Sequence, residues 1–152
     1  MKRILIIEDN TEVRENIAEL LELSNYEVIE AKDGKIGVQK TLEHKPDLIL
    51  CDVMMPELDG FGVLRILDKK TETADIPFIF LTAKAEKTDF RKGMNLGADD
   101  YITKPFDDVE LLDAIEMRLK KSERIKTVFD GSSQGLNAFI NEARGQKELE
   151  KL

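Results

Sequence analysis

Carboxylates directly follow two apolar segments of the chain that have the composition of buried strands. Glu8 and Asp9 come after RILII, and Asp52 comes after LILC. Thr82 ends the apolar segment IPFIFLT, and Lys104 follows DYIT. The carboxyl ends of parallel strands share one edge of a sheet, where functional crevices lie. We therefore expect these five side chains to converge at that edge.

The expected cluster has the composition of a magnesium-dependent phosphoryl-transfer site. Three neighbouring carboxylates repel one another unless a cation lies among them, and an all-oxygen ligand set suits a hard divalent ion. Asp9, Asp52, a backbone carbonyl near Met54 and a phosphoryl oxygen would surround Mg²⁺. Lys104 would neutralise an oxygen of the transferring phosphoryl group, and the Thr82 hydroxyl would bond another. Asp52 is then the in-line nucleophile.

Each of these residues, taken alone, also has an ordinary structural explanation. Glu8 and Asp9 could cap the helix that follows them, which is the favoured interpretation in isolation. Thr82 could be a plain strand residue and Lys104 a solvated charge. The chemical interpretation rests on all five positions falling at one edge.

The elements that must position these residues alternate along the chain. Five short apolar segments, RILIIED, EVIEA, DLILCD, IPFIFLTA and DYITKP, are separated by stretches with helical periodicity. This pattern predicts a βαβ series and a parallel sheet with helices on both faces. The helices are expected after Asn10 or Thr11, from about Asp33 to His44, around Phe61–Leu67, around Phe90–Met94, and from Asp107 through Leu119.

Composition limits the classes of function. The 152 residues carry 23 basic and 31 acidic side chains, a net charge of -8, and the excess lies entirely in residues 1–121. Such a segment would be repelled by nucleic acid phosphates. The single cysteine, Cys51, excludes an internal disulfide and is expected to be a buried, inert thiol. No apolar run is long enough to span a bilayer, so a cytoplasmic protein without membrane contact is expected.

The last thirty residues differ from the rest of the chain. DGSSQG is a short break after the charged RLKKSER, and an apolar helical face follows it, made of Leu136, Phe139, Ile140 and Ala143. A short amphipathic helix of this kind needs a partner surface. We expect a main domain over residues 1–121 and a linker with an amphipathic helical extension over residues 122–152.

Four motifs together resemble a known family. IIEDN, LILCDVMMPELDG, IFLTAKAE and GADDYITKPF, in this order and spacing, are similar to the receiver domain of two-component response regulators. The resemblance covers Met1 to about Lys121. It implies a flavodoxin-like α/β fold, a doubly wound five-stranded parallel sheet in the order 2-1-3-4-5 with five flanking helices. It also implies that Asp52 accepts a phosphoryl group from a sensor histidine kinase in a Mg²⁺-dependent reaction.

The same resemblance assigns roles around the metal. By position, Glu8 and Asp9 are the acidic pair near Mg²⁺, and Met54 supplies its backbone carbonyl. We further hypothesise that the Met54 side chain and Lys84 flank the phosphoryl position and slow hydrolysis of the aspartyl phosphate. The one histidine, His44, is expected far from this edge, so the phosphodonor must come from another protein.

The resemblance also implies a switch. Thr82 and Tyr101 become the switch pair, and Lys104 becomes the phosphate contact, with a cis bond to Pro105 expected. In the family, the threonine shifts toward the phosphoryl group and the aromatic ring turns inward. This repacks the face of the fourth helix, fifth strand and fifth helix, which would control an effector or homodimerisation. Tyr101 alone would be read as a core or rim aromatic.

Two other classes of function compete with a signalling domain. A magnesium-dependent phosphatase of the haloacid dehalogenase type also uses an aspartate nucleophile, but it needs a second acid two residues later, where this chain has Met54. A nucleotide switch would need a G-x-x-x-x-G-K-[ST] loop, which is absent from the sequence. A receiver-like binding module that is never phosphorylated remains the main alternative. We expect no turnover enzyme.

The ending of the chain leaves its output open. A stand-alone receiver normally ends with its fifth helix, whereas this sequence continues to Leu152, so a fragment of a longer protein is expected. The ending GLNAFINEARGQKELEKL is similar to segments that lead into a Crp/Fnr-type transcription regulator. The alternative is a helix for dimerisation or partner docking.

Overall fold

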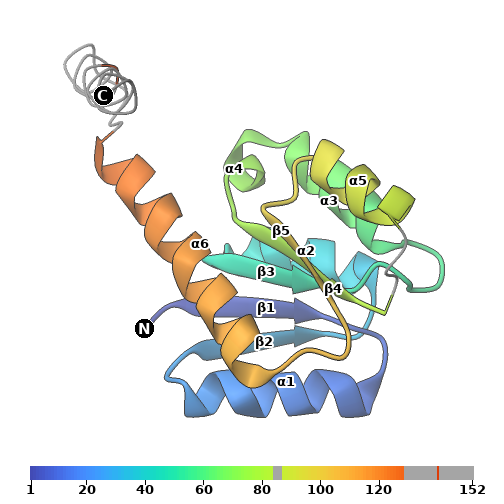
Figure 1. Ribbon diagram of the computed structural model, residues 1–152. Helices are drawn as coiled ribbons and strands as arrows, with labels where there is room; N and C mark the ends of the chain where they lie inside the picture. The colour runs from blue at the N-terminus through green and yellow to red at the C-terminus, as the bar shows by residue number, and fades with distance from the viewer. Residues whose placement is uncertain (84–86, 129–139, 141–152) are drawn as a thin grey trace. The chain divides into compact units, whose positions relative to one another are not determined.

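A five-stranded parallel sheet forms the centre of the computed structural model, which describes residues 1–83, 87–128 and 140 (Figure 1). Its strands are β1 (Arg3–Ile7), β2 (Glu27–Ala31), β3 (Leu48–Cys51), β4 (Phe78–Thr82) and β5 (Asp100–Thr103). They lie in the order β2-β1-β3-β4-β5, and every neighbouring pair is parallel. The flavodoxin-like α/β fold and its strand order are thus confirmed.

Helices connect the strands. They are α1 (Thr11–Leu23), α2 (Gly34–His44), α3 (Gly60–Asp68), α4 (Thr71–Ala74), α5 (Lys87–Asn95) and α6 (Asp108–Val128). The sequence predicted five helices, and α4 is the addition. It is a single turn between α3 and β4, too short to show helical periodicity. Its buried Thr73 hydroxyl donates to the Leu67 carbonyl at 2.6 Å, which ties the turn to the end of α3.

Both faces of the sheet are covered, which explains why β3 and β4 are apolar without alternation. One core cluster includes Leu5, Ile7, Ile49, Phe78 and Phe80 of the strands with Phe61, Val63, Leu64 and Leu67 of α3. Strand residues between these, such as Ile4 and Leu50, point to the opposite face and are equally buried. There α1 and the first turns of α6 contribute Ile17, Leu21, Leu111 and Ile115. Figure 1 shows α1 and α2 on opposite sides of the sheet.

Side-chain caps begin three of the helices that follow strands. Asn10 accepts from the backbone N–H of Val13 at 3.0 Å and starts α1. Asp33 starts α2 and Asp59 starts α3 in the same way. Such caps satisfy N–H groups that the helix itself leaves unpaired. Because each of these helices follows a strand through a loop, it begins on the side of the sheet where the residues expected to do chemistry lie.

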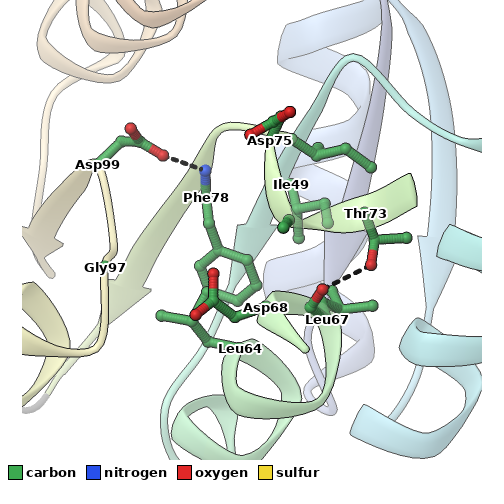
Figure 2. A pocket seen from close by; sticks show the side chains of 11 residues that line it. Ile49, Leu64, Leu67, Asp68, Thr73, Asp75, Phe78, Gly97 and Asp99 are labelled. Carbon is green, nitrogen blue, oxygen red and sulfur yellow. Dashed lines mark hydrogen bonds between the residues drawn. The ribbon is translucent and has the colours of Figure 1, made fainter. Parts of the chain in front are cut away.

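A small cavity of about 190 Å³ lies at the other edge, where β3 and β4 begin. Figure 2 shows Ile49, Leu64 and Phe78 around it, with Asp99 on its wall. The Asp99 carboxylate accepts from the backbone N–H of Phe78 at 2.8 Å. The Asp99 carboxylate thus stabilises the first residue of β4.

The chain forms two compact units, Met1–Arg118 and Leu119–Leu152. Most of the expected apolar face of the extension, Leu136, Phe139 and Ala143, lies outside the described residues. The predicted domain boundary at residue 121 therefore stays a prediction. Among the described residues, no helix is both long and apolar enough to cross a bilayer.

Candidate functional site

The sheet ladder continues past two strand ends and fixes the backbone of the acidic residues. The N–H of Glu8 donates to the Ala31 carbonyl at 3.0 Å, and the N–H of Asp52 donates to the Ile7 carbonyl at 3.0 Å. Both carboxylates therefore leave backbone that is still held by neighbouring strands. This is the local reason why residues 44 positions apart in sequence lie side by side.

Glu8, Asp9 and Asp52 form one acidic cluster. Each offers a carboxylate oxygen, and these oxygens all lie within 4.8 Å of one another. Glu8 is buried, the Asp52 side chain is 12 % exposed, and Asp9 is exposed to solvent. The cluster thus runs from the interior to the surface, which leaves one side open to an incoming group.

Lys104 reaches the same place from the end of β5. Its Nζ lies 2.5 Å from Oε1 of Glu8 and 3.5 Å from Oδ2 of Asp52. The Lys104–Pro105 peptide bond is cis, as the resemblance implied. The ammonium group therefore offsets part of the negative charge of the cluster.

Glu8 shows how well the cluster would suit a further cation. Burial raises the pKa of its carboxyl to about 7, with Asp52 adding to the rise and Lys104 opposing it. Its Oε2 is buried and accepts no hydrogen bond from any residue in the described part of the chain. A hard divalent ion prefers an all-oxygen donor set of this kind. The residues present therefore fit Mg²⁺.

Met54 lies beside Asp52, and its side chain points away from the core. Its backbone N–H donates to Oδ1 of Asp52 at 3.3 Å. Its side chain is 59 % exposed, whereas the neighbouring Met55 is buried. Met54 lines an open groove of about 500 Å³ together with residues that include Phe61 and Lys92. It is therefore a rim residue, while Met55 fills the core.

Thr82 and Tyr101 are both buried, on neighbouring strands. The Tyr101 ring centroid lies 5.8 Å from that of Phe80 and 5.5 Å from that of Phe90. Burial, followed by the negative charges of Asp89 and Asp52, raises the pKa of the Tyr101 phenol to about 12. Tyr101 is thus a core aromatic that connects β5 with α5. Lys84, expected to flank the phosphoryl position, lies outside the described residues.

Two other sequence predictions are confirmed. Cys51 is buried, and burial together with nearby carboxylates raises the pKa of its thiol well above the ordinary value, which keeps the thiol neutral. Its Sγ donates to the Asp52 carbonyl at 3.2 Å. His44 lies at the opposite edge, where Arg3 at the start of β1 donates to its carbonyl at 3.2 Å.

Sequence reasoning missed the role of Gly60 in shaping the site. A Cβ at this position would lie 2.2 Å from the carbonyl oxygen of Asp52, closer than any real contact. The Gly60 N–H also donates to the Val53 carbonyl at 2.9 Å. The sequence signal here was the PELDG turn before α3, which did not reveal the backbone approach.

Comparison with known proteins decides the family. The sequence model of the response regulator receiver domain matches residues 4–116. The chain belongs to this family. Its receiver domain is 42% identical over 125 residues to the DNA-binding dual master transcriptional regulator RpaA of Synechocystis, covering 82% of this chain and 52% of RpaA. The chain thus spans about half the length of the curated relatives it matches.

Solved receiver structures share the fold. A CheY-like response regulator receiver domain protein from Methanospirillum hungatei aligns with a TM-score of 0.77 at 31% identity, covering 82% of this chain and 98% of that one. The receiver domain of a sensor histidine kinase from Pseudomonas aeruginosa aligns with a TM-score of 0.73 at 30% identity, covering 78% and 98%. That structure has a magnesium ion coordinated in its active site cleft. The predicted resemblance is confirmed at the level of family and fold, which places this receiver among two-component signalling proteins.

Proposed function

We propose that this receiver accepts a phosphoryl group on Asp52 from a sensor histidine kinase, in a Mg²⁺-dependent reaction. The observation that carries the proposal is the meeting of Glu8, Asp9 and Asp52 with Lys104 at one edge of the sheet. The bound magnesium of the P. aeruginosa relative supports the choice of metal. Asp9, Asp52 and the Met54 carbonyl would hold the ion, with Glu8 beside them.

In the phosphoryl transfer, Asp52 is the one residue of this protein that would form a covalent bond. An Asp52 carboxylate oxygen attacks phosphorus in line, the bond from phosphorus to the donor histidine nitrogen breaks, and that nitrogen regains a proton from solvent. Bound Mg²⁺ supplies positive charge to the phosphoryl oxygens. Lys104 Nζ, already 3.5 Å from Asp52, can turn from Glu8 to a phosphoryl oxygen.

We infer that the response is transmitted through Thr82 and Tyr101. The buried Thr82 hydroxyl would bond the phosphoryl group, and the movement would repack the ring of Tyr101. That ring contacts Phe90 of α5, which is 46 % exposed, so a change inside reaches the surface. The α5–β5–α6 face would then control a homodimer or an effector.

The identity of the effector stays a proposal. The curated relative RpaA is named as a DNA-binding transcriptional regulator, and this chain covers about half of its length. We propose a transcriptional output supplied by a segment other than the acidic receiver. The Crp/Fnr-type connection and the absence of nucleic acid contacts in this segment stay predictions.

We propose that the exposed Met54 side chain slows hydrolysis of the phosphoaspartate. Met54 is exposed beside Asp52, where its side chain would hinder an attacking water. Replacing it by serine should speed the loss of phosphate, followed as the decay of the phosphorylated mass after the donor is removed. An unchanged decay would contradict this role. The part assigned to Lys84 falls outside the described residues.

Intact mass after incubation with acetyl phosphate, with and without Mg²⁺, tests the function. The wild type should gain one phosphoryl group only with the metal, and Asp52→Asn should gain none. Asp75→Asn is the matched control, because Asp75 is an exposed carboxylate at the opposite edge. No gain in the wild type, or the same gain in Asp52→Asn, would favour a binding module that is not phosphorylated.

A further inference from the structure

Arg14 connects three elements beside the acidic cluster. It is the fourth residue of α1, and its side chain is 14 % exposed. Its Nη1 donates to the Glu8 carbonyl at 2.9 Å, and its Nε pairs with Oε1 of Glu30, on β2, at 3.2 Å. The guanidinium group thus links α1 to the end of β1 and to β2. It contacts a main-chain atom of the site.

The contacted carbonyl belongs to the peptide that joins Glu8 to Asp9. That peptide is planar, so fixing its oxygen also fixes the direction in which the Asp9 Cα leaves the strand. On the other side of Glu8, the N–H is held by the Ala31 carbonyl. Asp9 itself is exposed and follows the last residue held by the sheet. Its position in the cluster therefore depends on how this peptide is oriented.

We propose that Arg14 is a positioning residue that holds the Glu8–Asp9 peptide so that the Asp9 carboxylate stays in the group that binds Mg²⁺. The proposal rests on the proposed function, because it concerns the same metal. It assigns Arg14 no contact with metal or phosphate. Its effect passes through the backbone.

The positive charge of Arg14 and its proposed positioning role have opposite effects on the affinity for Mg²⁺, so the two can be separated by experiment. A fixed positive charge near a cation site repels Mg²⁺, so charge alone predicts that removing Arg14 tightens metal binding. Loss of positioning predicts the reverse. The two explanations differ in the sign of the change.

The chain offers a matched control in Arg3. Its Nη1 donates to the His44 carbonyl at 3.2 Å, and its Nη2 pairs with Glu27 of β2 at 3.2 Å. Arg3 therefore makes the same two kinds of contact at the opposite edge of the sheet. Arg3→Met removes one charge, one carbonyl contact and one ion pair without touching the acidic cluster.

The experiment is calorimetric titration with MgCl₂ of the full chain, without phosphodonor, for the wild type, Arg14→Met, Arg14→Lys and Arg3→Met. Arg14→Met should bind Mg²⁺ about tenfold more weakly, as for other residues that orient metal ligands. Arg14→Lys, which keeps a donor, should recover part of the affinity. Arg3→Met should bind like the wild type.

Thermal unfolding of each variant completes the test. Arg14→Met and Arg3→Met should lose comparable stability, which separates positioning from general loosening. Equal or tighter binding by Arg14→Met, or an equal loss in Arg3→Met, would overturn the role of Arg14. Absence of Mg²⁺ binding in the wild type would overturn the metal-dependent function as well, so the two failures are distinguishable.

Discussion

Lys104 has a different partner in the structure from the one its residue type suggested. The sequence indicated a phosphate contact, whereas the ammonium group pairs with Glu8 and lies near Asp52. A buried carboxylate without a compensating charge is costly, and the lysine reduces that cost. In the proposed function, the same ammonium would move to the phosphoryl group once Mg²⁺ neutralises the carboxylates. Lys104 would thus serve the site both before and after phosphorylation.

At the residue scale, the Tyr101 phenol gives a prediction on pH. Its pKa is raised to about 12 in the folded protein, against about 10 in an unfolded chain. The folded state therefore holds this proton more tightly. The stabilisation is complete below about pH 10 and is lost as the pH rises through about 12.

Ultraviolet absorbance of ionised tyrosine during alkaline titration measures this shift. The wild type should show a transition near pH 12, and Tyr101→Phe should lose it. Tyr26→Phe is the matched control and should keep it. A single transition near pH 10 in Tyr26→Phe would contradict the buried position of the ring.

From residue types, the members of the site could be predicted, but most of the contacts between them could not. Glu8 and Asp52 could be placed together because the ends of parallel strands meet at one edge. The contact of Arg14 could not be predicted, since a long side chain on a helix can reach many carbonyls. Gly60 was missed because its role depends on a backbone approach that exists only in the folded chain.

At the scale of elements, the connection from β3 to α3 is held closely against Asp52. Glu57 has a positive φ of 68°, and the Leu58 N–H donates to the Pro56 carbonyl at 2.8 Å, which makes a tight three-residue turn. Gly60 then passes against the Asp52 carbonyl. The turn and the glycine together set where α3 starts relative to Asp52.

Gly60→Ala should therefore impair the site as well as the fold. The added methyl group cannot fit unless the Asp52 backbone moves, and such overpacking costs about 1–3 kcal/mol. We expect lower stability in urea unfolding and slower phosphorylation by acetyl phosphate, measured by intact mass under conditions where the variant is folded.

Gly97→Ala is the control for this prediction. Gly97 has a φ of 102°, so alanine is strained there, but nothing lies within 4 Å of the added Cβ. This variant should lose stability and keep the wild-type rate of phosphorylation. Equal rates in the two variants would show that Gly60 has no special relation to Asp52.

Helix starts were predictable because they depend on local chemistry. Asn10, Asp33 and Asp107 each accept from an N–H three residues later, as their positions in the sequence indicated. The single turn α4 was not predictable, because four residues carry no periodic signal. It forms where Thr73 can bond the end of the preceding helix.

At the scale of the whole molecule, the proposed switch predicts a change of association. Phosphorylation should alter the α5–β5–α6 face and favour a homodimer. Sedimentation velocity with acetyl phosphate and Mg²⁺ should show a larger species in the wild type and none in Asp52→Asn. A wild type that stays monomeric while its mass shows full phosphorylation would contradict dimerisation and leave an effector as the output.

The fold as a whole followed from the alternation of strands and helices. That alternation predicted a parallel sheet with helices on both faces, and the fully buried strands β3 and β4 agree with it. The strand order came from the family resemblance, since periodicity does not determine which strands are neighbours. The expected amphipathic extension stays a prediction, because most of its residues lie outside the described part of the chain.

The position of Met54 has a consequence for how such a protein can change over generations. The Asp52 backbone is held by the sheet, whereas the Met54 side chain is exposed to solvent at the rim. Substitutions there leave the core untouched, so they cost little stability. If Met54 controls hydrolysis of the phosphoaspartate, the duration of the signal depends on a surface residue. Selection can then change the lifetime of the phosphorylated state without changing the residues that carry out phosphorylation.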